Sequence, residues 1–172
     1  MRAPTFTESV GFRMMSLIHY DLYKLLRDPE KALKAAGLRP GQRVLEAGCG
    51  PGFFTVPAAK LVGGHGSLVS LDINPLAVEK VRQRIDDAQV DNAEIMFANA
   101  CDTKLPDGSF DLAFLFGFPW RKGGKRDILK EMHRVLKPEG TLAYEGRPFS
   151  DDEFFELVTC ESRISKYRKK YH

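Results

Sequence analysis

The chain of 172 residues falls in the size range of one globular domain, so a second domain of similar size is not expected. Hydrophobic residues make up 43% and charged residues 28%, which excludes the disordered and fibrous classes. The 26 Lys and Arg against 23 Asp and Glu leave a formal charge of +3, too even to indicate a nucleic-acid or anionic-membrane partner.

Three cysteines, Cys49, Cys101 and Cys160, lie far apart in the chain. This spacing predicts neither a disulfide framework nor a metal site of the CxxC type. Glu8 and Arg13 interrupt the apolar residues near the N-terminus, which has the form of neither a signal peptide nor a membrane span. The sequence therefore predicts a cytoplasmic protein that holds no metal.

The chain opens with helical periodicity. Apolar residues recur at helical spacing over 10–25, and a second helix is expected over 29–37, where it closes at a glycine. Residues 1–40 are thus predicted to be a helical lead-in to an α/β core of residues 41–172, the whole forming one domain.

Strand-like and helix-like stretches then alternate. The expected strands are a short one opening at 44–45 and others at 67–73, 93–100, 110–117 and 141–145. The expected helices are at 53–61, from 74 to about 88, at 128–136 before a turn at 137–140, and at 151–158. Such alternation predicts a doubly wound α/β fold with a mostly parallel sheet, which binds ligands beyond the carboxyl ends of its strands.

A glycine-rich segment, E-A-G-C-G-P-G at 46–52, lies between the first strand and its helix, where glycines let the backbone turn sharply and approach a ligand. Asp72 ends the second strand, and its carboxylate can accept from both hydroxyls of a ribose. Together they predict a nucleoside site. The alternative is that the glycines only form a tight turn and that Asp72 only supports the helix start at Asn74.

Two classes of phosphate-binding glycine loop fit this segment poorly. The chain contains no Gly-Lys-Ser or Gly-Lys-Thr, which excludes a nucleotide P-loop. The dinucleotide fingerprint requires a third glycine where Phe53 stands, so an NAD-linked oxidoreductase is the weaker alternative.

The segment V-L-E-A-G-C-G-P-G at 44–52 resembles motif I of the class I S-adenosylmethionine-dependent methyltransferases. The resemblance continues in order through S-L-D-I at 70–73, L-P-D-G-S-F-D-L at 105–112 and R-V-L-K-P-E-G-T-L at 134–142. Within that family the chain is most similar to the small-molecule branch that includes the ubiquinone/menaquinone-biosynthesis type. The resemblance implies a Rossmann-like fold, S-adenosylmethionine as cofactor and methyl transfer to a small-molecule acceptor.

The resemblance also implies a cofactor site made of Glu46, Gly48, Cys49, Gly50, Gly52, Asp72, Ile73, Asn99, Ala100 and Phe116. In it the glycines would lie against the methionine moiety, Asp72 would hold the ribose and Ile73 would lie against the adenine. Glu46 would suit the positive charges of the cofactor, or would instead bond backbone amides of the loop.

Three of these positions have particular expected roles. The family often has an Asp where this chain has Asn99, whose carbonyl could still accept from the adenine amino group while the Ala100 amide donates to the ring. Asn99 could equally be a turn residue. Phe116 would face the reactive methyl, or would simply be buried in the core.

No catalytic residue is assigned, because methyl transfer from a sulfonium needs mainly alignment and exclusion of water. The chain reads F-G-F-P-W at 116–120, so it lacks the (Asp/Asn)-Pro-Pro-(Tyr/Phe) element typical of adenine and protein-glutamine methyltransferases. Trp120, His19 and Tyr20 are candidate substrate contacts, each of which packing or surface exposure would also explain.

The basic tail, residues 163–172, supplies at most one terminal strand where the family usually has two, so a shortened sheet edge is expected. Lysines that blunt a solvated edge strand explain its pattern better than contacts with RNA phosphates. A non-catalytic binding module, an RNA methyltransferase and a homodimer stay open as alternatives.

Overall fold

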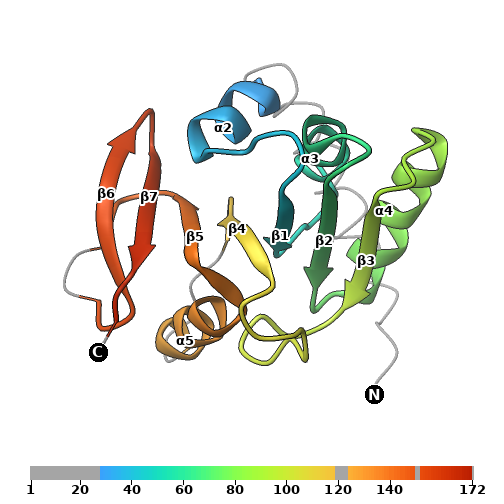
Figure 1. The fold of residues 1–172 in the computed structure, drawn as a ribbon. Coiled ribbons are helices and arrows are strands. Elements are labelled where there is room, and N and C mark those ends of the chain that lie inside the picture. The colour runs from blue at the N-terminus through green and yellow to red at the C-terminus, as the bar shows by residue number, and fades with distance from the viewer. Residues whose placement is uncertain (1–27, 119–123, 150–151, 172) are drawn as a thin grey trace.

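The computed structural model describes residues 28–118, 124–149 and 152–171. Seven strands form one sheet in the order β3-β2-β1-β4-β5-β7-β6, with helices packed on both faces (Figure 1). Strands β1 to β5 pair with one another in parallel, whereas β7 is antiparallel to both β5 and β6. The prediction of a doubly wound, mostly parallel α/β fold is confirmed.

Helix α2, Pro29–Ala36, is the expected second helix of the lead-in. Asp28 caps its N-terminus through bonds from the Glu30 and Lys31 amides, and Gly37 ends it in the left-handed region at φ 95°. The helix expected over 10–25 lies outside the described residues. Strand β1, Arg43–Ala47, and helix α3, Thr55–Val62, then form the first strand–helix unit.

The second unit consists of β2, Ser67–Asp72, helix α4, Pro75–Asp87, and β3, Ala93–Phe97. The Asn74 side chain accepts from the Leu76 amide and Pro75 occupies the first turn, as the sequence predicts. Strand β3 ends three residues earlier than expected, because the chain turns at Asn99, which forms an isolated bridge with Asp102.

The third unit consists of β4, Phe110–Leu115, helix α5, Lys125–Val135, and β5, Leu136–Glu145. The prediction of a turn at 137–140 is wrong, since β5 begins at Leu136, directly after the helix, and pairs with Phe110 of β4. The register shifts between Phe110 and Leu112, and this irregularity accommodates the Pro-Glu-Gly segment within a strand.

Two strands end the chain, β6, Phe155–Glu161, and β7, Ile164–Lys169, so the predicted shortened edge is wrong. They form an antiparallel hairpin whose two turn residues, Ser162 and Arg163, have positive φ angles of 50° and 70°. The basic tail is not an edge strand either, because β7 lies inside the sheet between β5 and β6.

The helix expected at 151–158 is also wrong, and the reason is local. The Asp152 carboxylate accepts from the amides of Phe154 and Phe155, a contact that also starts helices. Here the chain continues as β6, because Phe155 is buried and the following residues pair with β7. Long-range pairing therefore overrides a helix-start signal.

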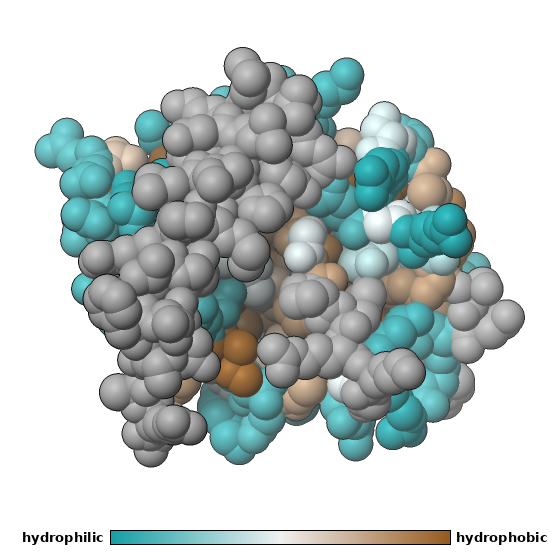
Figure 2. Space-filling view, turned by 180° about the vertical axis from the view of Figure 1, so that it is seen from behind, coloured by the Kyte–Doolittle hydropathy of each residue, from teal (hydrophilic) through white to brown (hydrophobic). Residues whose placement is uncertain are grey.

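Apolar side chains alternate along the strands and divide the core between the two faces of the sheet. Helices α2 and α3 cover one face around Val44, Leu112 and Phe114, and α4 extends this layer over Ile95. Helix α5 covers the other face around Leu45 and Ala113. Seen from behind, the described part of the surface shows hydrophobic residues only in patches among hydrophilic ones (Figure 2).

Glu131 of α5 fastens the loop that precedes β4. Its carboxylate accepts from the Thr103 amide at 2.7 Å and hydroxyl at 2.6 Å, and from two nitrogens of Arg134. Arg134 also donates to the Leu105 carbonyl and to Asp107. The bonds from Arg134 and Thr103 lower the pKa of Glu131 to about 2. Arg134 thus connects the motif at 134–142 with the motif at 105–112 through charged hydrogen bonds.

None of the helices within the described ranges is both long and apolar enough to cross a membrane.

We expect Glu131→Gln to lower the free energy of unfolding by about 2 kcal/mol at pH 7, because charged hydrogen bonds to Thr103 and Arg134 are lost. The folded pKa lies below the ordinary value of 4.5, so this stabilisation is present above pH 4.5 and is lost as the pH falls toward 2. Urea unfolding of both proteins at several pH values should show the difference closing in that window.

The matched control is Glu30→Gln, which removes the exposed Glu30–Lys34 pair on α2 and should cost less than about 0.5 kcal/mol. An equal loss in the control, or a difference that does not change with pH, would contradict the role given to Glu131.

Candidate functional site

The glycine loop follows β1 at the carboxyl edge of the sheet. Gly48, Gly50 and Gly52 have φ angles of +80°, +51° and +82°, a region that other residues adopt only with strain. The amides of Gly48 and Cys49 both donate to the Leu71 carbonyl at the end of β2. The loop is thus built from left-handed glycines and is fastened to the neighbouring strand.

The three glycines face different surroundings. A β-carbon on Gly52 would stand 2.8 Å from Val81 of α4, and one on Gly48 would stand 2.7 Å from the ring of Phe118. A β-carbon on Gly50 would meet nothing within 4 Å. Gly52 is therefore needed for packing against α4, whereas Gly50 borders open space.

Asp72 ties the loop to the start of α4. One carboxylate oxygen accepts from the Gly50 amide at 2.9 Å, and the other accepts from the Asn74 amide at 2.8 Å. A carboxylate has about four acceptor positions, so each oxygen can accept a further hydrogen bond. The structure brings together the two features that the sequence singled out, the glycine loop and the acid that ends β2.

Two exposed apolar side chains flank Asp72. Ile73 follows it in the chain and is 65% exposed, and Phe97 pairs with it across β2 and β3 and is 44% exposed. Sequence analysis named Ile73 but missed Phe97. The sequence signal for Phe97 is a large apolar residue at the end of a strand. Because the sequence predicts that this strand continues to residue 100, it places Phe97 within the strand.

Glu46 lies beneath the loop, between the sheet and α3. Its side chain is buried, and one carboxylate oxygen accepts from the hydroxyls of Thr55 at 2.6 Å and Ser70 at 2.7 Å. Burial raises the pKa of Glu46 to about 7, although these two hydrogen bonds oppose the shift. The described partners of Glu46 are hydroxyls and not the loop amides, and no sequence pattern predicted Thr55 or Ser70 as partners.

The side chains of two other expected residues pack in the core. Cys49 is buried beside Val78 and Val81 of α4, and burial raises the pKa of its thiol. Ala100 is buried on the α5 face of the sheet. Because both side chains are buried, these residues can contact a ligand only through backbone groups. Their side chains can affect the site only through the packing of the core.

Asn99 forms its own turn. Its side-chain oxygen accepts from the Cys101 amide at 3.0 Å, and the residue is exposed beyond the end of β3. The turn role expected as an alternative is therefore present in the structure, and one acceptor position of the oxygen is left.

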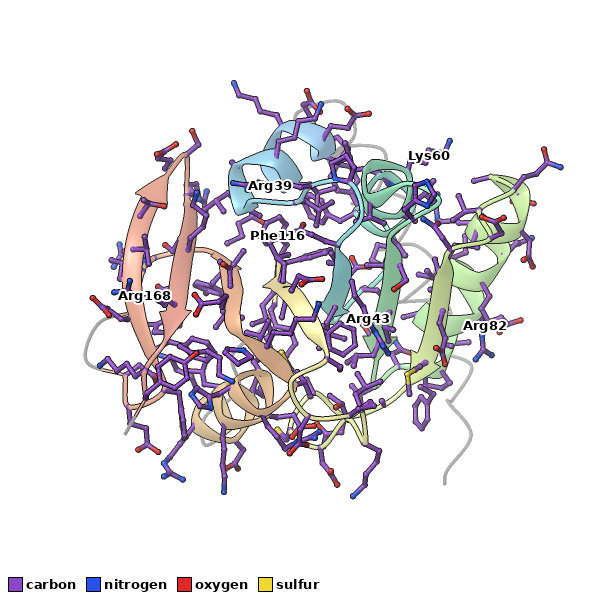
Figure 3. The ribbon with its side chains drawn as sticks, viewed as in Figure 1. Arg39, Arg43, Lys60, Arg82, Phe116 and Arg168 are labelled. Carbon is purple, nitrogen blue, oxygen red and sulfur yellow. The ribbon has the colours of Figure 1, made fainter. Side chains whose placement is uncertain are left out.

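Phe116 lies beside β4 (Figure 3), and its side chain is only 6% exposed because it packs among aromatic rings. Its ring meets Phe54 edge-on at 5.0 Å and lies 5.1 Å from Phe114. Phe118, two residues further on, covers Gly48 instead. Sequence analysis did not single out Phe118.

The candidate substrate contacts Trp120, His19 and Tyr20 lie outside the described residues. In the described part of the chain, no group of three or more His, Cys, Asp and Glu side chains is placed to hold a metal ion.

Comparison with known proteins adds an independent observation. A family model described as "Methyltransferase domain" matches residues 44–140, more than half of the chain. A demethylmenaquinone methyltransferase of Listeria welshimeri is 32% identical over 132 residues, 76% of this chain and 55% of that protein. One from Geobacillus sp. is 30% identical over 131 residues, which are 76% of this chain and 55% of that protein. The chain spans about half the length of the curated relatives it matches.

Solved structures agree on the fold. A SAM dependent methyltransferase from Aquifex aeolicus is 24% identical with a TM-score of 0.67, over 81% of this chain and 88% of that one. A protein from Methanococcus maripaludis is 16% identical with a TM-score of 0.75, over 100% of this chain and 98% of that one. At these identities the likeness shows the shared fold alone.

The surroundings of the glycines predict unequal effects of substitution. Gly52→Ala should lower the free energy of unfolding by about 2 to 4 kcal/mol, because left-handed strain of about 1 to 2 kcal/mol adds to a clash with Val81. Gly50→Ala should cost the strain alone. Chemical denaturation of both variants checks this, and equal losses would show that the space beside Gly50 is not open.

Glu46 predicts a pH dependence of the opposite sign to that of Glu131. Its folded pKa of about 7 exceeds the ordinary 4.5, so the folded state binds the additional proton and loses stability as the pH rises from 4.5 to 7. Relative to Glu46→Gln, the wild-type free energy of unfolding should fall by about 3 kcal/mol across that range. Unfolding curves at pH 5 and 8 measure it, and a constant difference would refute the raised pKa.

Proposed function

Because the chain belongs to the methyltransferase-domain family, we propose that it binds S-adenosylmethionine between the glycine loop and Asp72 and moves a methyl group to a small-molecule acceptor. The observation that carries the proposal is the contact of the Asp72 carboxylate with the Gly50 amide, beside the open space at Gly50. A ligand there meets a carboxylate with acceptor capacity and a backbone without a side chain in its way.

The proposed contacts divide the cofactor among three groups of residues. Asp72 accepts from the ribose hydroxyls, and the exposed side chains of Ile73 and Phe97 cover the adenine faces. Gly48 and Gly50 lie against the methionine end. These side chains and backbone groups would replace water around the cofactor and orient it along the sheet edge.

The other expected residues act either from within the core or at the adenine edge in the proposal. Cys49 and Phe116 set the shape of the loop and of the β4 end from within the core, and the Ala100 amide and the Asn99 oxygen reach the adenine edge. Glu46 places a buried carboxyl beneath the loop, where a bound cation would favour its ionised form. When bound, the cofactor supplies a methyl group activated by its sulfonium, and no residue of the chain is assigned a proton transfer.

The acceptor is proposed as a small molecule on the strength of the relatives. Two of them carry the name demethylmenaquinone methyltransferase, so demethylmenaquinone is the first compound to assay. The cytoplasmic location and the single domain, with residues 1–40 leading into the core, belong to the same proposal.

Calorimetry with S-adenosylhomocysteine tests the cofactor site without knowledge of the acceptor. We expect saturable binding near one to one, no binding of NADH, and a loss of about 1 to 3 kcal/mol in Asp72→Ala, because the ribose hydroxyls lose their acceptor. Asp87→Ala, which removes an exposed carboxylate at the end of α4, is the matched control and should bind as the wild type does.

Two results would overturn the proposal. Folded wild-type protein that binds no S-adenosylhomocysteine would favour a non-catalytic module, and tighter binding of NADH would favour the oxidoreductase. Circular dichroism of each variant separates a lost contact from a lost fold, since Asp72 also accepts from the Gly50 and Asn74 amides.

A further inference from the structure

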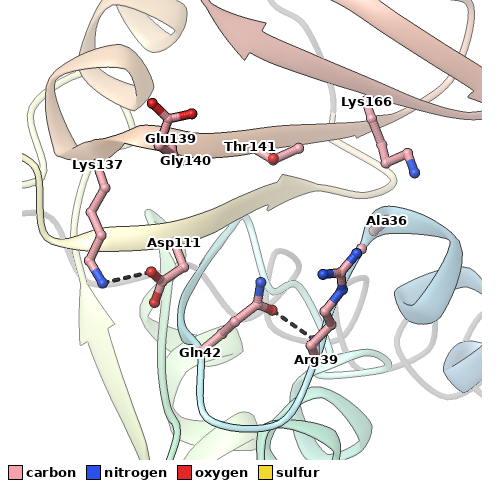
Figure 4. Close-up of a pocket in the computed structure, with 10 residues that line it drawn as sticks. Ala36, Arg39, Gln42, Asp111, Lys137, Glu139, Gly140, Thr141 and Lys166 are labelled. Atoms are coloured by element: carbon pink, nitrogen blue, oxygen red, sulfur yellow. Dashed lines mark hydrogen bonds and ion pairs between the residues drawn. The ribbon is translucent and has the colours of Figure 1, made fainter.

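A cavity lies at the opposite edge of the sheet from the glycine loop, where the parallel strands begin. It has a volume of about 320 Å³ and is formed by the end of α2, the loop before β1, the starts of β4 and β5, and the middle of β7 (Figure 4). Gln42 and Gly48 bracket β1 and are six residues apart, which corresponds to about 20 Å of strand. A ligand in this cavity is therefore too far from the glycine loop to receive a methyl group there.

Three cations and two carboxylates line the cavity, and one of the carboxylates, Asp111, is paired with a cation. Asp111 accepts from the Lys137 ammonium group at 2.6 Å and from the Arg43 amide at 2.7 Å. Burial alone would raise the pKa of Asp111, but these bonds lower it, so Asp111 and Lys137 neutralise each other. Glu139, the other acid, is exposed to solvent, so its charge is screened by water.

The remaining cations, Arg39 and Lys166, form no ion pair with a carboxylate of the described residues. The Lys166 side chain runs along the end of α2, with its δ-carbon 3.9 Å from the position of a β-carbon on Gly37. Figure 4 shows its ammonium group directed toward the side from which the Arg39 guanidinium rises. Two like charges that converge on a hollow favour an anion between them.

Neutral donors complete the lining. The Gln42 side-chain oxygen accepts from the Arg39 amide at 2.7 Å, which fixes the orientation of the amide group and leaves its NH₂ as a donor. Thr141 adds a hydroxyl from the wall formed by β5. Apart from the exposed Glu139 carboxylate, the groups available to a ligand are thus donors that arrive from three walls, an arrangement that suits a tetrahedral oxyanion better than a planar carboxylate.

We propose that this cavity binds the phosphoryl group of a small molecule, held by Arg39, Lys166, Gln42 and Thr141. Arg39 supplies a planar pair of N–H donors, and Lys166 supplies a point charge. The cavity can hold a ligand larger than phosphate itself, so the phosphoryl group serves as the anchor. This site is independent of the proposed cofactor site, and either one can fail without the other.

The test is a titration of the ¹⁵N-labelled full chain with inorganic phosphate and then pyrophosphate, at constant ionic strength, followed by amide chemical shifts. We expect saturable shifts at Gly37, Gly140, Thr141 and Lys166, and none at Gly50. Citrate, a carboxylate anion, should cause much smaller shifts at the same amides. Shifts that do not saturate, or equal shifts with citrate, would overturn the proposal.

Charge-matched variants separate a site from general attraction. Lys166→Gln and Arg39→Gln should each weaken pyrophosphate binding about tenfold or more, the effect of losing one charged hydrogen bond. Lys60→Gln removes the same charge from the exposed end of α3, where Figure 3 shows it apart from Arg39, and should change nothing. An equal loss in Lys60→Gln would overturn the site.

The variants also keep the two proposals distinguishable. Lys166→Gln should bind S-adenosylhomocysteine with the affinity of the wild type, which shows in addition that the variant is folded. Phosphate shifts without any binding of S-adenosylhomocysteine would refute only the cofactor site, and the reverse result would refute only the phosphoryl site.

Discussion

The contact on which the candidate site depends is the pair of hydrogen bonds that Asp72 accepts. One carboxylate fixes the amide of Gly50 and the amide of Asn74, and so holds together the glycine loop, the end of β2 and the start of α4. The Leu71 carbonyl reinforces this junction from one residue earlier, since it accepts from Gly48 and Cys49. Without this junction, the left-handed glycines would be a flexible segment, because glycine loses more conformational freedom on folding than any other residue.

Two buried carboxyls on opposite sides of the sheet illustrate how the environment decides the charge state. Glu131 meets a guanidinium and a backbone amide, and its pKa falls to about 2. Among the described residues Glu46 accepts only from hydroxyls, which do not offset its burial, and its pKa rises to about 7. The first stabilises the fold when ionised, whereas the second opposes folding when ionised. A carboxyl that is costly to ionise directly beneath the glycine loop supports the functional site proposed there, because packing alone would favour an apolar residue.

The parts of the fold that the sequence predicted are those specified by local signals. Asn74 with Pro75 marks the start of α4, Gly37 marks the end of α2, and the apolar runs mark the parallel strands. The C-terminal hairpin escaped prediction because Ser162 and Arg163 adopt positive φ angles without glycine or asparagine, and because Asp152 gives a helix-start contact before a strand. Pairing of β7 with β5 and with β6 decides both, and such pairing is not visible in a local sequence pattern.

The candidate site divides in the same way. The glycine loop and Asp72 were predictable, because their residue types are required at fixed places after two strands. Phe97, Phe118 and the hydroxyl partners of Glu46 were not, since their positions depend on where strands end and on which faces of β2 and α3 meet. The sequence thus indicates where the proposed ligand site lies, whereas the tertiary structure decides what surrounds it.

The same parallel strands position both edges of the sheet. β1 and β4 carry the loop before Arg43 and the Asp111 side chain at one end, and the glycine loop and Phe116 at the other. The carboxyl edge of such a sheet is the usual ligand site, because the chain there turns from strands into helix N-termini. The amino edge lacks that advantage, so a cavity there needs side chains to attract an anion. Arg39 and Lys166 meet this requirement, and they come from segments more than a hundred residues apart that only the antiparallel β7 brings together.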